Sequence, residues 1–229
     1  LDQWMPGSAL YSLPFAFRLE GPLDTAALEQ ALQAVVDRHE SLRTTFRGEG
    51  TAIQHVAAHL PVTLERAGSG SEAETLACMQ CEAERPFDLA RGPLFRALLI
   101  REAEQRHVLV LNLHHIVSDG WSIGVLYQEL SAAYLARDLA PLPLQYPDHA
   151  AWQRQWLQGD VLQRELGFWE RELADVPHVL ELPTDRPRPA VQRFAGAIHR
   201  FTVPAHLHRA LEELARREGA TLFMALLTG

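Results

Sequence analysis

The sequence predicts a mixed α/β fold, an α+β arrangement in which helices flank a mixed sheet. A nearly uninterrupted apolar run, Val108–Leu113, has the pattern of a strand that is buried on both faces. Residues Asp24–Arg38 instead repeat apolar side chains at helical spacing behind an aspartate N-cap. The residues expected on the buried side of this helix are Leu28, Leu32, Val35 and Val36. With 229 residues and 47% hydrophobic content, the chain can bury a substantial core as one large or two smaller domains.

The first half of the chain alternates strands and helices without an internal repeat. Ser71 and Glu74 form a capping-box pattern, which predicts that a helix begins there. The polar loop Ala103–Arg106 is short enough to join two strands as a hairpin. The predicted strands are Tyr11–Leu19, Leu42–Phe46, Ala52–Val56, Val62–Arg66, Phe95–Glu102 and Val108–Leu113, and the second helix spans Ser71–Glu84.

The second half is predicted to be mainly helical and to contain a linker. Helices are expected at Ile123–Leu135, Pro147–Gln158 and Val161–Leu173, and their tryptophans Trp152, Trp156 and Trp169 are expected to pack in a core or between lobes. Asp175–Phe194 carries four prolines and several arginines, including Arg193, which is typical of a linker. A strand at Ala197–Val203, a helix at Ala205–Glu218 and an apolar helix start at Ala220–Leu227 follow. We therefore expect a first unit at residues 1–174, a linker at 175–195 and the beginning of a further unit at 196–229, which are the first lobe, the linker and the start of the second lobe in the family resemblance given below.

The stretch His114–Gly120 places two imidazoles, a carboxylate and a glycine directly after the predicted buried strand. Because neighbouring strand residues point to opposite faces, only one of His114 and His115 can face an open channel. The same geometry disfavours a metal site, since the two histidines cannot bind one ion together. A Ser-His-Asp hydrolase is disfavoured because the chain has no G-x-S-x-G elbow and Ser118 has no evident oxyanion-hole partner. A purely structural histidine remains an alternative.

Four segments together resemble the condensation domains of nonribosomal peptide synthetases, which have the chloramphenicol acetyltransferase-like fold. His114–Gly120 matches the family pattern HHxxxDG, and Arg38–Phe46 matches RHExLRTxF. Tyr146–Trp152 matches YxDxAxW, and Leu182–Pro189 looks like the segment that joins the two lobes of that fold. The segments occur in the family's order, and the stretch from Arg38 to Pro189 over which they are spread takes in most of the chain.

The resemblance implies that an amine on one carrier-protein arm attacks a thioester on another, which forms an amide bond. It implies catalytic roles for His115 and Gly120, with His115 facing the channel and acting on a proton or orienting the amine. His114, Asp119, Arg38, Arg43 and Trp152 are implied to support the site. We expect His114 to face packed protein and Asp119 to pair with a buried arginine, Arg38 rather than Arg43, since an unpaired buried charge is costly.

The resemblance also implies the partners. These are donor and acceptor peptidyl carrier proteins, whose phosphopantetheine arms hold the substrates, and an adenylation domain of the same megasynthase. No cofactor or metal is expected to bind the chain directly. Because family members place the active site between two lobes, we expect these 229 residues alone to fold their first lobe without condensing substrates.

Other members of the superfamily provide the alternatives. Heterocyclising relatives have an aspartate in place of His114 and are therefore disfavoured. Epimerising relatives share the histidines but usually carry Ser-Trp after a DGx triplet, whereas here Trp121 precedes Ser122. A recruitment platform without catalytic activity is a third alternative, which the intact His115, Asp119 and Gly120 disfavour.

Composition narrows the possible partners and the location. The 29 acidic and 21 basic residues give a net charge of −8, which disfavours nucleic acid as a partner. No apolar run is long enough to cross a membrane, so we expect no membrane association and a cytoplasmic location. Cys78 and Cys81 form a C-x-x-C without a second pair, and are expected to be partly buried helical thiols rather than zinc ligands.

Overall fold

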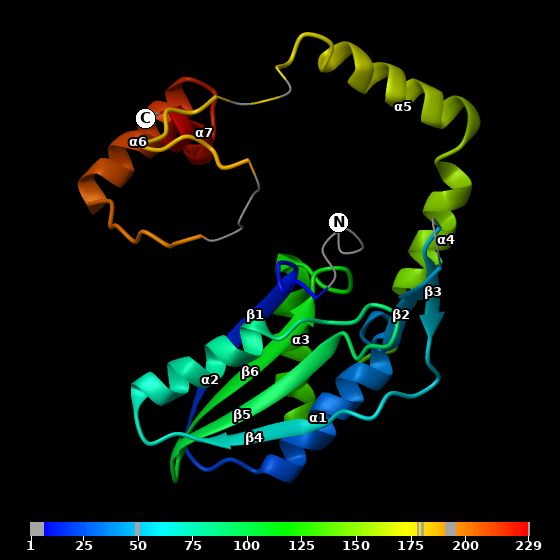
Figure 1. The fold of residues 1–229 in the computed structure, drawn as a ribbon, viewed down its shortest axis with the longest axis vertical. Coiled ribbons are helices and arrows are strands. Elements are labelled where there is room, and N and C mark those ends of the chain that lie inside the picture. The colour runs from blue at the N-terminus through cyan, green and yellow to red at the C-terminus, as the bar shows by residue number, and fades with distance from the viewer. Residues whose placement is uncertain (1–6, 49–50, 178, 180, 191–195, 229) are drawn as a thin grey trace. The chain divides into compact units, whose positions relative to one another are not determined.

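The computed structural model describes residues 7–48, 51–177, 179, 181–190 and 196–228. The chain divides into two compact units, Leu1–Leu180 and Glu181–Gly229. The first unit contains both sheets and most of the helices (Figure 1). Its elements are β1 (Ser12–Glu20), α1 (Thr25–Arg38), the 3-10 helix η2 (Glu40–Arg43), β2 (Thr44–Arg47), β3 (Ile53–Val56), β4 (Leu64–Gly68), α2 (Glu72–Glu84), β5 (Phe95–Ala103), β6 (Arg106–His114), α3 (Gly120–Tyr134), α4 (Tyr146–Trp156) and α5 (Gly159–Glu172).

A four-stranded mixed sheet with the order β1-β6-β5-β4 forms the centre of the first unit (Figure 1). The β5 and β6 strands are antiparallel neighbours, which confirms the predicted hairpin, and β4 pairs with β5 in parallel. β6 lies between β1 and β5, and its residues from His107 to His114 are buried. The predicted mixed sheet with flanking helices is therefore confirmed, and the strand that leads to the HHxxxDG segment is the most enclosed one.

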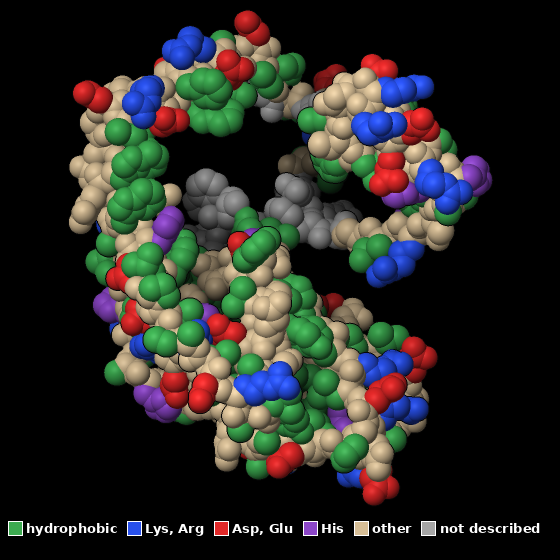
Figure 2. Space-filling model, turned by 180° about the vertical axis from the view of Figure 1, so that it is seen from behind, with side chains coloured by type: hydrophobic (Ala, Val, Ile, Leu, Met, Phe, Trp, Pro, Cys, Tyr) green, Lys and Arg blue, Asp and Glu red, His purple; other side chains and the backbone are tan. Residues whose placement is uncertain are grey.

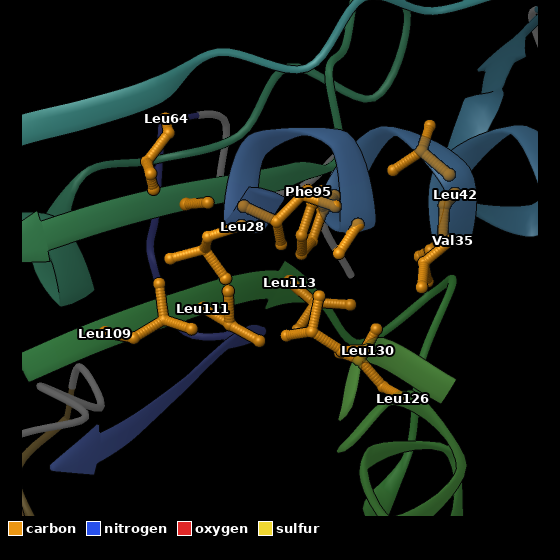
Figure 3. Packing of buried hydrophobic residues seen from close by; sticks show 14 of the residues in the cluster. Leu28, Val35, Leu42, Leu64, Phe95, Leu109, Leu111, Leu113, Leu126 and Leu130 are labelled. Carbon is orange, nitrogen blue, oxygen red and sulfur yellow. The ribbon is translucent and has the colours of Figure 1, made fainter. Parts of the chain in front are cut away.

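Helices α1 and α3 cover one face of this sheet with an apolar core. Leu111 and Leu113 of β6 point to this face, and Leu32 of α1 is completely buried against it. Figure 3 shows leucine side chains from α1, α3 and the strands pointing toward one another. The predicted N-cap of α1 is confirmed, because the Asp24 carboxylate accepts hydrogen bonds from two backbone N–H groups of the first turn, at 2.9 and 3.0 Å.

Helix α2 lies on the opposite face of the sheet (Figure 1). Its predicted N-cap is also confirmed, since the Ser71 hydroxyl accepts from the Glu74 N–H. The apolar cluster on this face is smaller and consists of Ile100, Val108 and Val110 with partly buried neighbours that include Cys78. Cys78 is partly buried, whereas Cys81 is exposed, which differs from the prediction for the second thiol.

One local prediction in the first unit is wrong, and a second is wrong in part. Leu42 and Arg43 lie in η2 rather than in a strand, because the chain turns there to bury Leu42 against the α1 core. The three tryptophans on α4 and α5 do not pack in the core of this unit, since Trp152, Trp156 and Trp169 are 53%, 46% and 56% exposed, and their packing between lobes stays a prediction. Figure 2 shows hydrophobic side chains on the surface of these helices.

The second unit contains α6 (Ala205–Arg217) and α7 (Leu222–Thr228), close to the predicted helices. The strand predicted at Ala197–Val203 is wrong, because these residues have no regular secondary structure. A strand needs a neighbour for its backbone hydrogen bonds, and the described part of this unit offers helices alone. The end of the predicted linker, residues 191–195 with Arg193, lies outside the described residues. Among the described helices, none is long and apolar enough to cross a membrane.

Candidate active site

The HHxxxDG segment forms the connection between β6 and α3. His114 is the last residue of β6, and Gly120 is the first residue of α3. The chain turns immediately after the strand, since the Val117 N–H donates to the His114 carbonyl at 3.0 Å. The His115 N–H donates to the Tyr11 carbonyl at 2.8 Å, which holds the start of this turn against β1.

The two histidines lie in different environments, as strand alternation predicts. His114 is 6% exposed and faces the α2 side of the sheet, where its ring centroid lies 6.0 Å from those of Tyr11 and Phe87. Its Nδ1 accepts a hydrogen bond of 3.0 Å from the Ile116 N–H. His115 is exposed. His114 is thus the packed residue and His115 the exposed one, as expected.

The predicted ion pair between Asp119 and Arg38 is wrong. Asp119 is exposed and caps α3, since its carboxylate accepts from the Ser122 N–H at 2.8 Å and from the Ser122 hydroxyl at 2.6 Å. These bonds, the one from the hydroxyl first, lower the pKa of Asp119 below its ordinary value. The carboxylate is exposed and bonded within its own helix start, so it needs no buried arginine.

Arg38 instead pairs with Glu129 of α3. Arg38 Nε donates to the Glu129 carboxylate at 3.0 Å, and Nη2 donates to the Ala140 carbonyl at 2.6 Å. The same carboxylate oxygen lies 2.6 Å from Nε2 of His39. Glu129 therefore joins the first two residues of the RHExLRTxF segment to α3. Glu129 was not among the residues predicted from the sequence, although its place one position before the buried Leu130 makes it a polar residue beside the apolar stripe of the helix.

Arg43 and Trp152 make the contacts described here with residues other than Asp119. Arg43 donates to the Ala57 carbonyl and lies 3.5 Å from the Glu40 carboxylate, so it links η2 to the segment after β3. Trp152 stacks on Trp156, with ring centroids 5.4 Å apart and an interplanar angle of 9°. These contacts tie both residues to other parts of the chain than the HHxxxDG turn, so their predicted support of the site remains a prediction.

Gly120 occupies a position where a side chain would meet open space. A Cβ built on Gly120 has nothing within 4 Å, and the residue does not adopt a left-handed backbone conformation. Gly120 therefore begins α3 without needing the left-handed freedom of a glycine. The open space would allow substrate to approach the backbone closely.

A pocket of about 160 Å³ joins two of the motif segments identified in the sequence. One wall comes from the first residues after Arg38 and the other from the HHxxxDG turn and the start of α3. Its lining includes His39, Ser41, Leu42, Val117, Ser118 and Trp121. Two motifs that are far apart in the sequence thus form one concave surface, which includes Val117 and Ser118 of the HHxxxDG turn.

Two alternative chemistries find no support at this turn. The Ser118 hydroxyl is buried without a hydrogen-bond partner among the described residues, so it has no general base to activate it as a nucleophile. Across the ranges that the structure describes, no group of three or more His, Cys, Asp or Glu side chains could hold a metal ion.

Comparison with known proteins decides the family. The model of the family described as Condensation domain matches residues 1–229. This chain belongs to the condensation domains of nonribosomal peptide synthetases. One linear gramicidin synthase protein of Brevibacillus parabrevis is 49% identical over 99% of the chain, and the match covers 3% of that synthase protein.

Solved structures support the same fold for this condensation-domain chain. The crystal structure of the X-domain from teicoplanin biosynthesis matches with a TM-score of 0.85 and 35% identity, over 94% of this chain and 50% of that one. The X-domain in its complex with OxyB matches with a TM-score of 0.82 and 36% identity, over 92% of this chain and 48% of that one. The chain thus spans about half the length of these X-domain chains and a small part of the gramicidin synthase protein.

Proposed function

We propose that this condensation-domain chain contributes the histidine side of a site for amide bond formation between two carrier-bound substrates. The observation that carries the proposal is the separation of the two histidines, with His114 packed under the turn and His115 open to solvent at the end of β6. Such an arrangement presents one imidazole on the turn that directly follows a buried strand, which suits general acid–base work or substrate orientation.

In the proposed reaction the acceptor's α-amine nitrogen attacks the carbonyl carbon of the donor thioester. A C–N bond forms, the C–S bond breaks, and the proton released from the nitrogen ends on the departing phosphopantetheine thiolate. An ordinary α-amine has a pKa near ~8, so a sizeable fraction is already neutral at cellular pH. His115 then needs only to accept and return one proton or to hold the amine in line. The open space at Gly120 would admit the reacting groups close to the α3 backbone.

The proposed partners follow from this chemistry. The donor and acceptor arms belong to two peptidyl carrier proteins, which an adenylation domain of the same synthetase would load. The chain itself then needs no bound cofactor for the transfer. The exposure of His115 and the pocket lined by Val117 and Ser118 of the same turn support access by such arms.

The proposal can be tested in a hybrid synthase. The chain would replace the aligned stretch of the linear gramicidin synthase protein to which it is 49% identical. Donor and acceptor carrier proteins loaded with amino acids would be added, and dipeptidyl thioester would be measured by mass spectrometry, with the unexchanged domain as positive control. We expect dipeptide from the hybrid and its loss in His115→Ala. A folded hybrid without dipeptide would contradict the proposal.

A recruitment platform is the second candidate, and the likeness to an X-domain solved in complex with OxyB favours it. Under this hypothesis the chain binds a tailoring enzyme and forms no bond itself. The hybrid assay separates the two, because a platform would give no dipeptide although both carriers are loaded. Epimerisation gives a third outcome, an inverted aminoacyl thioester on a single carrier without a second substrate.

A further inference from the structure

A cluster of buried charge lies on the α2 side of the sheet, outside the proposed reaction site. Glu82 of α2, Arg96 of β5 and Asn112 of β6 are 5%, 8% and 0% exposed. Arg96 and Asn112 stand opposite each other in the antiparallel register, and Asn112 lies two residues before His114 on the same face of β6. The cluster therefore lies directly before the HHxxxDG turn.

Arg96 uses its guanidinium to hold the end of α2 in place. Nε donates to the Glu82 carboxylate at 2.6 Å, Nη2 donates to the Arg85 carbonyl at 2.7 Å, and Nη1 donates to the Pro86 carbonyl at 3.2 Å. The Asn112 side-chain amide adds donors to the Glu82 backbone carbonyl at 2.8 Å and to its carboxylate at 3.2 Å. This planar set of donors is a geometry that lysine cannot reproduce.

Phe87 connects the guanidinium to the active-site turn. Arg96 Cζ lies 3.8 Å from the centre of the Phe87 ring, and that ring meets the His114 imidazole edge to face, at 6.0 Å and 89°. Phe87 is 7% exposed, so its ring has little freedom. A continuous series of contacts between three planar groups thus runs from the buried cluster to His114.

His114 passes this constraint to the main chain after His115. Its own backbone N–H is held separately by the Leu94 carbonyl at 3.0 Å, whereas its ring Nδ1 accepts from the Ile116 N–H at 3.0 Å. The His114 ring therefore fixes the peptide that follows His115. A rotated His114 ring would lose the bond to Ile116 and would redirect the His115 side chain.

We propose that Arg96, held by Glu82 and stacked on Phe87, is a positioning residue that sets the orientation of His115 through His114. The value of this orientation for catalysis rests on the proposed function, but the orientation itself is a property of the chain. A buried ion pair adds little net stability compared with apolar side chains of similar size, so stability alone gives weak reason for this cluster.

The test uses the whole 229-residue chain with ¹⁵N-labelled histidine. Imidazole resonances of His114 and His115, assigned by single substitutions, would be followed by NMR through a pH titration. The rate of His115 carbethoxylation by diethyl pyrocarbonate would be measured by peptide mass spectrometry. Arg96→Lys keeps the charge but loses the planar donors, and Phe87→Leu keeps the ion pair but loses the stack. We expect both variants to shift the two imidazole titrations and to change the His115 modification rate.

Two control variants distinguish a change in the orientation of His115 from a general loss of stability. Val110→Ala removes buried volume from the same face of β6 without touching the stack. Arg85→Gln removes an ion pair of Glu82, at 3.1 Å, but leaves Phe87 in place. We expect wild-type titrations and modification rate in both, even where the melting temperature falls.

Wild-type imidazole behaviour in Arg96→Lys and Phe87→Leu would overturn the proposal, and so would equal shifts in Val110→Ala. If Arg96→Lys fails to fold, Phe87→Leu decides the question, because it retains the ion pair. In the hybrid synthase, Arg96→Lys should lower kcat by about 10- to 100-fold with the KM of the acceptor thioester unchanged. A hybrid that forms no amide at all would sink the proposed function, whereas the NMR result would still decide the positioning role.

Discussion

The two faces of the central sheet are built in different ways. On the α1 and α3 side the strands bury leucines against two helices in one large apolar cluster. On the α2 side the apolar cluster is small, and the strand ends nearest the HHxxxDG turn carry Arg96, Asn112 and His114. The first face supplies burial that tolerates approximate shape, whereas the second depends on directional bonds that fix individual side chains.

This difference indicates how one strand serves two purposes. Alternate residues of β6 enter the apolar core on one side and the polar cluster on the other. The apolar side stabilises the strand, and the polar side orients the turn that follows it. Substitutions on the two faces should therefore differ in kind as well as in size.

The largest effect is expected from breaking the buried ion pair on one side only. Glu82→Leu leaves the Arg96 guanidinium buried without its carboxylate and should lower the free energy of unfolding by about 3–5 kcal/mol. The double variant Glu82→Leu with Arg96→Met removes both charges and should recover most of that loss. Urea unfolding of the three proteins checks this, and a double variant as unstable as the single one would show that the polar cluster itself supplies the stability of this face.

Substitutions of two neighbouring residues of β6 allow the stability contributed by the two faces to be compared directly. Leu111→Ala opens a cavity in the large apolar cluster and should cost about 2–5 kcal/mol. Val110→Ala, one residue earlier and on the α2 side, should cost about 1.5 kcal/mol from the methyl groups it loses. Chemical denaturation gives both values, and equal losses would contradict the view that the α1 and α3 side holds the main core.

A smaller effect is expected from the ion pair between Arg38 of α1 and Glu129 of α3, which lies at the edge of the apolar core. A double-mutant cycle on Arg38 and Glu129 should give a coupling of about 0.5–3 kcal/mol, because the two groups bond directly. The matched cycle on Arg38 and Asp119 should be additive, since Asp119 bonds to Ser122 instead. Coupling in the second cycle and additivity in the first would restore the ion pair predicted from the sequence.

The smallest effect is expected at the helix cap. The pKa of Asp119 is lower in the folded protein than its unfolded value near ~3.9, so its stabilising contribution is complete above that pH and is lost as the pH falls through the folded pKa. The stability difference between wild type and Asp119→Asn should therefore shrink in strong acid. Ser122→Ala removes the hydroxyl donor and should move this loss toward higher pH. Unfolding measured across the acid range checks both, and a difference independent of pH would contradict the cap as the source.

Local signals in the sequence predicted most of the fold. Asp24 and Ser71 begin helices through bonds to residues two or three positions away, and period-2 alternation alone separates His114 from His115. The Asp119 cap was equally local, since Ser122 follows at the capping-box spacing, but the carboxylate was assumed to be buried. An exposed position at the start of a helix needed no distant partner.

Features that depend on how helices and strands pack against one another could not be predicted from the sequence. The Glu82–Arg96 bond requires the angle of α2 on the sheet, which no local pattern specifies. Glu129 meets Arg38 and His39 because α1 and α3 lie side by side on the same face, although they are far apart in the sequence. The strand predicted at Ala197–Val203 failed for a related reason, since strand formation depends on a neighbour that the sequence pattern does not supply.

Substituting each of the two histidines in the hybrid synthase tests their separate roles most directly. His115→Ala should lower the rate of dipeptide formation by about 10²- to 10⁴-fold, with the melting temperature close to that of wild type, because the side chain is exposed. His114→Ala should cause the larger fall in melting temperature, because it empties a packed position between Tyr11 and Phe87. A dipeptide yield from His115→Ala within about twofold of wild type, far smaller than the loss expected for an acid or base, would contradict the assignment of the reactive imidazole.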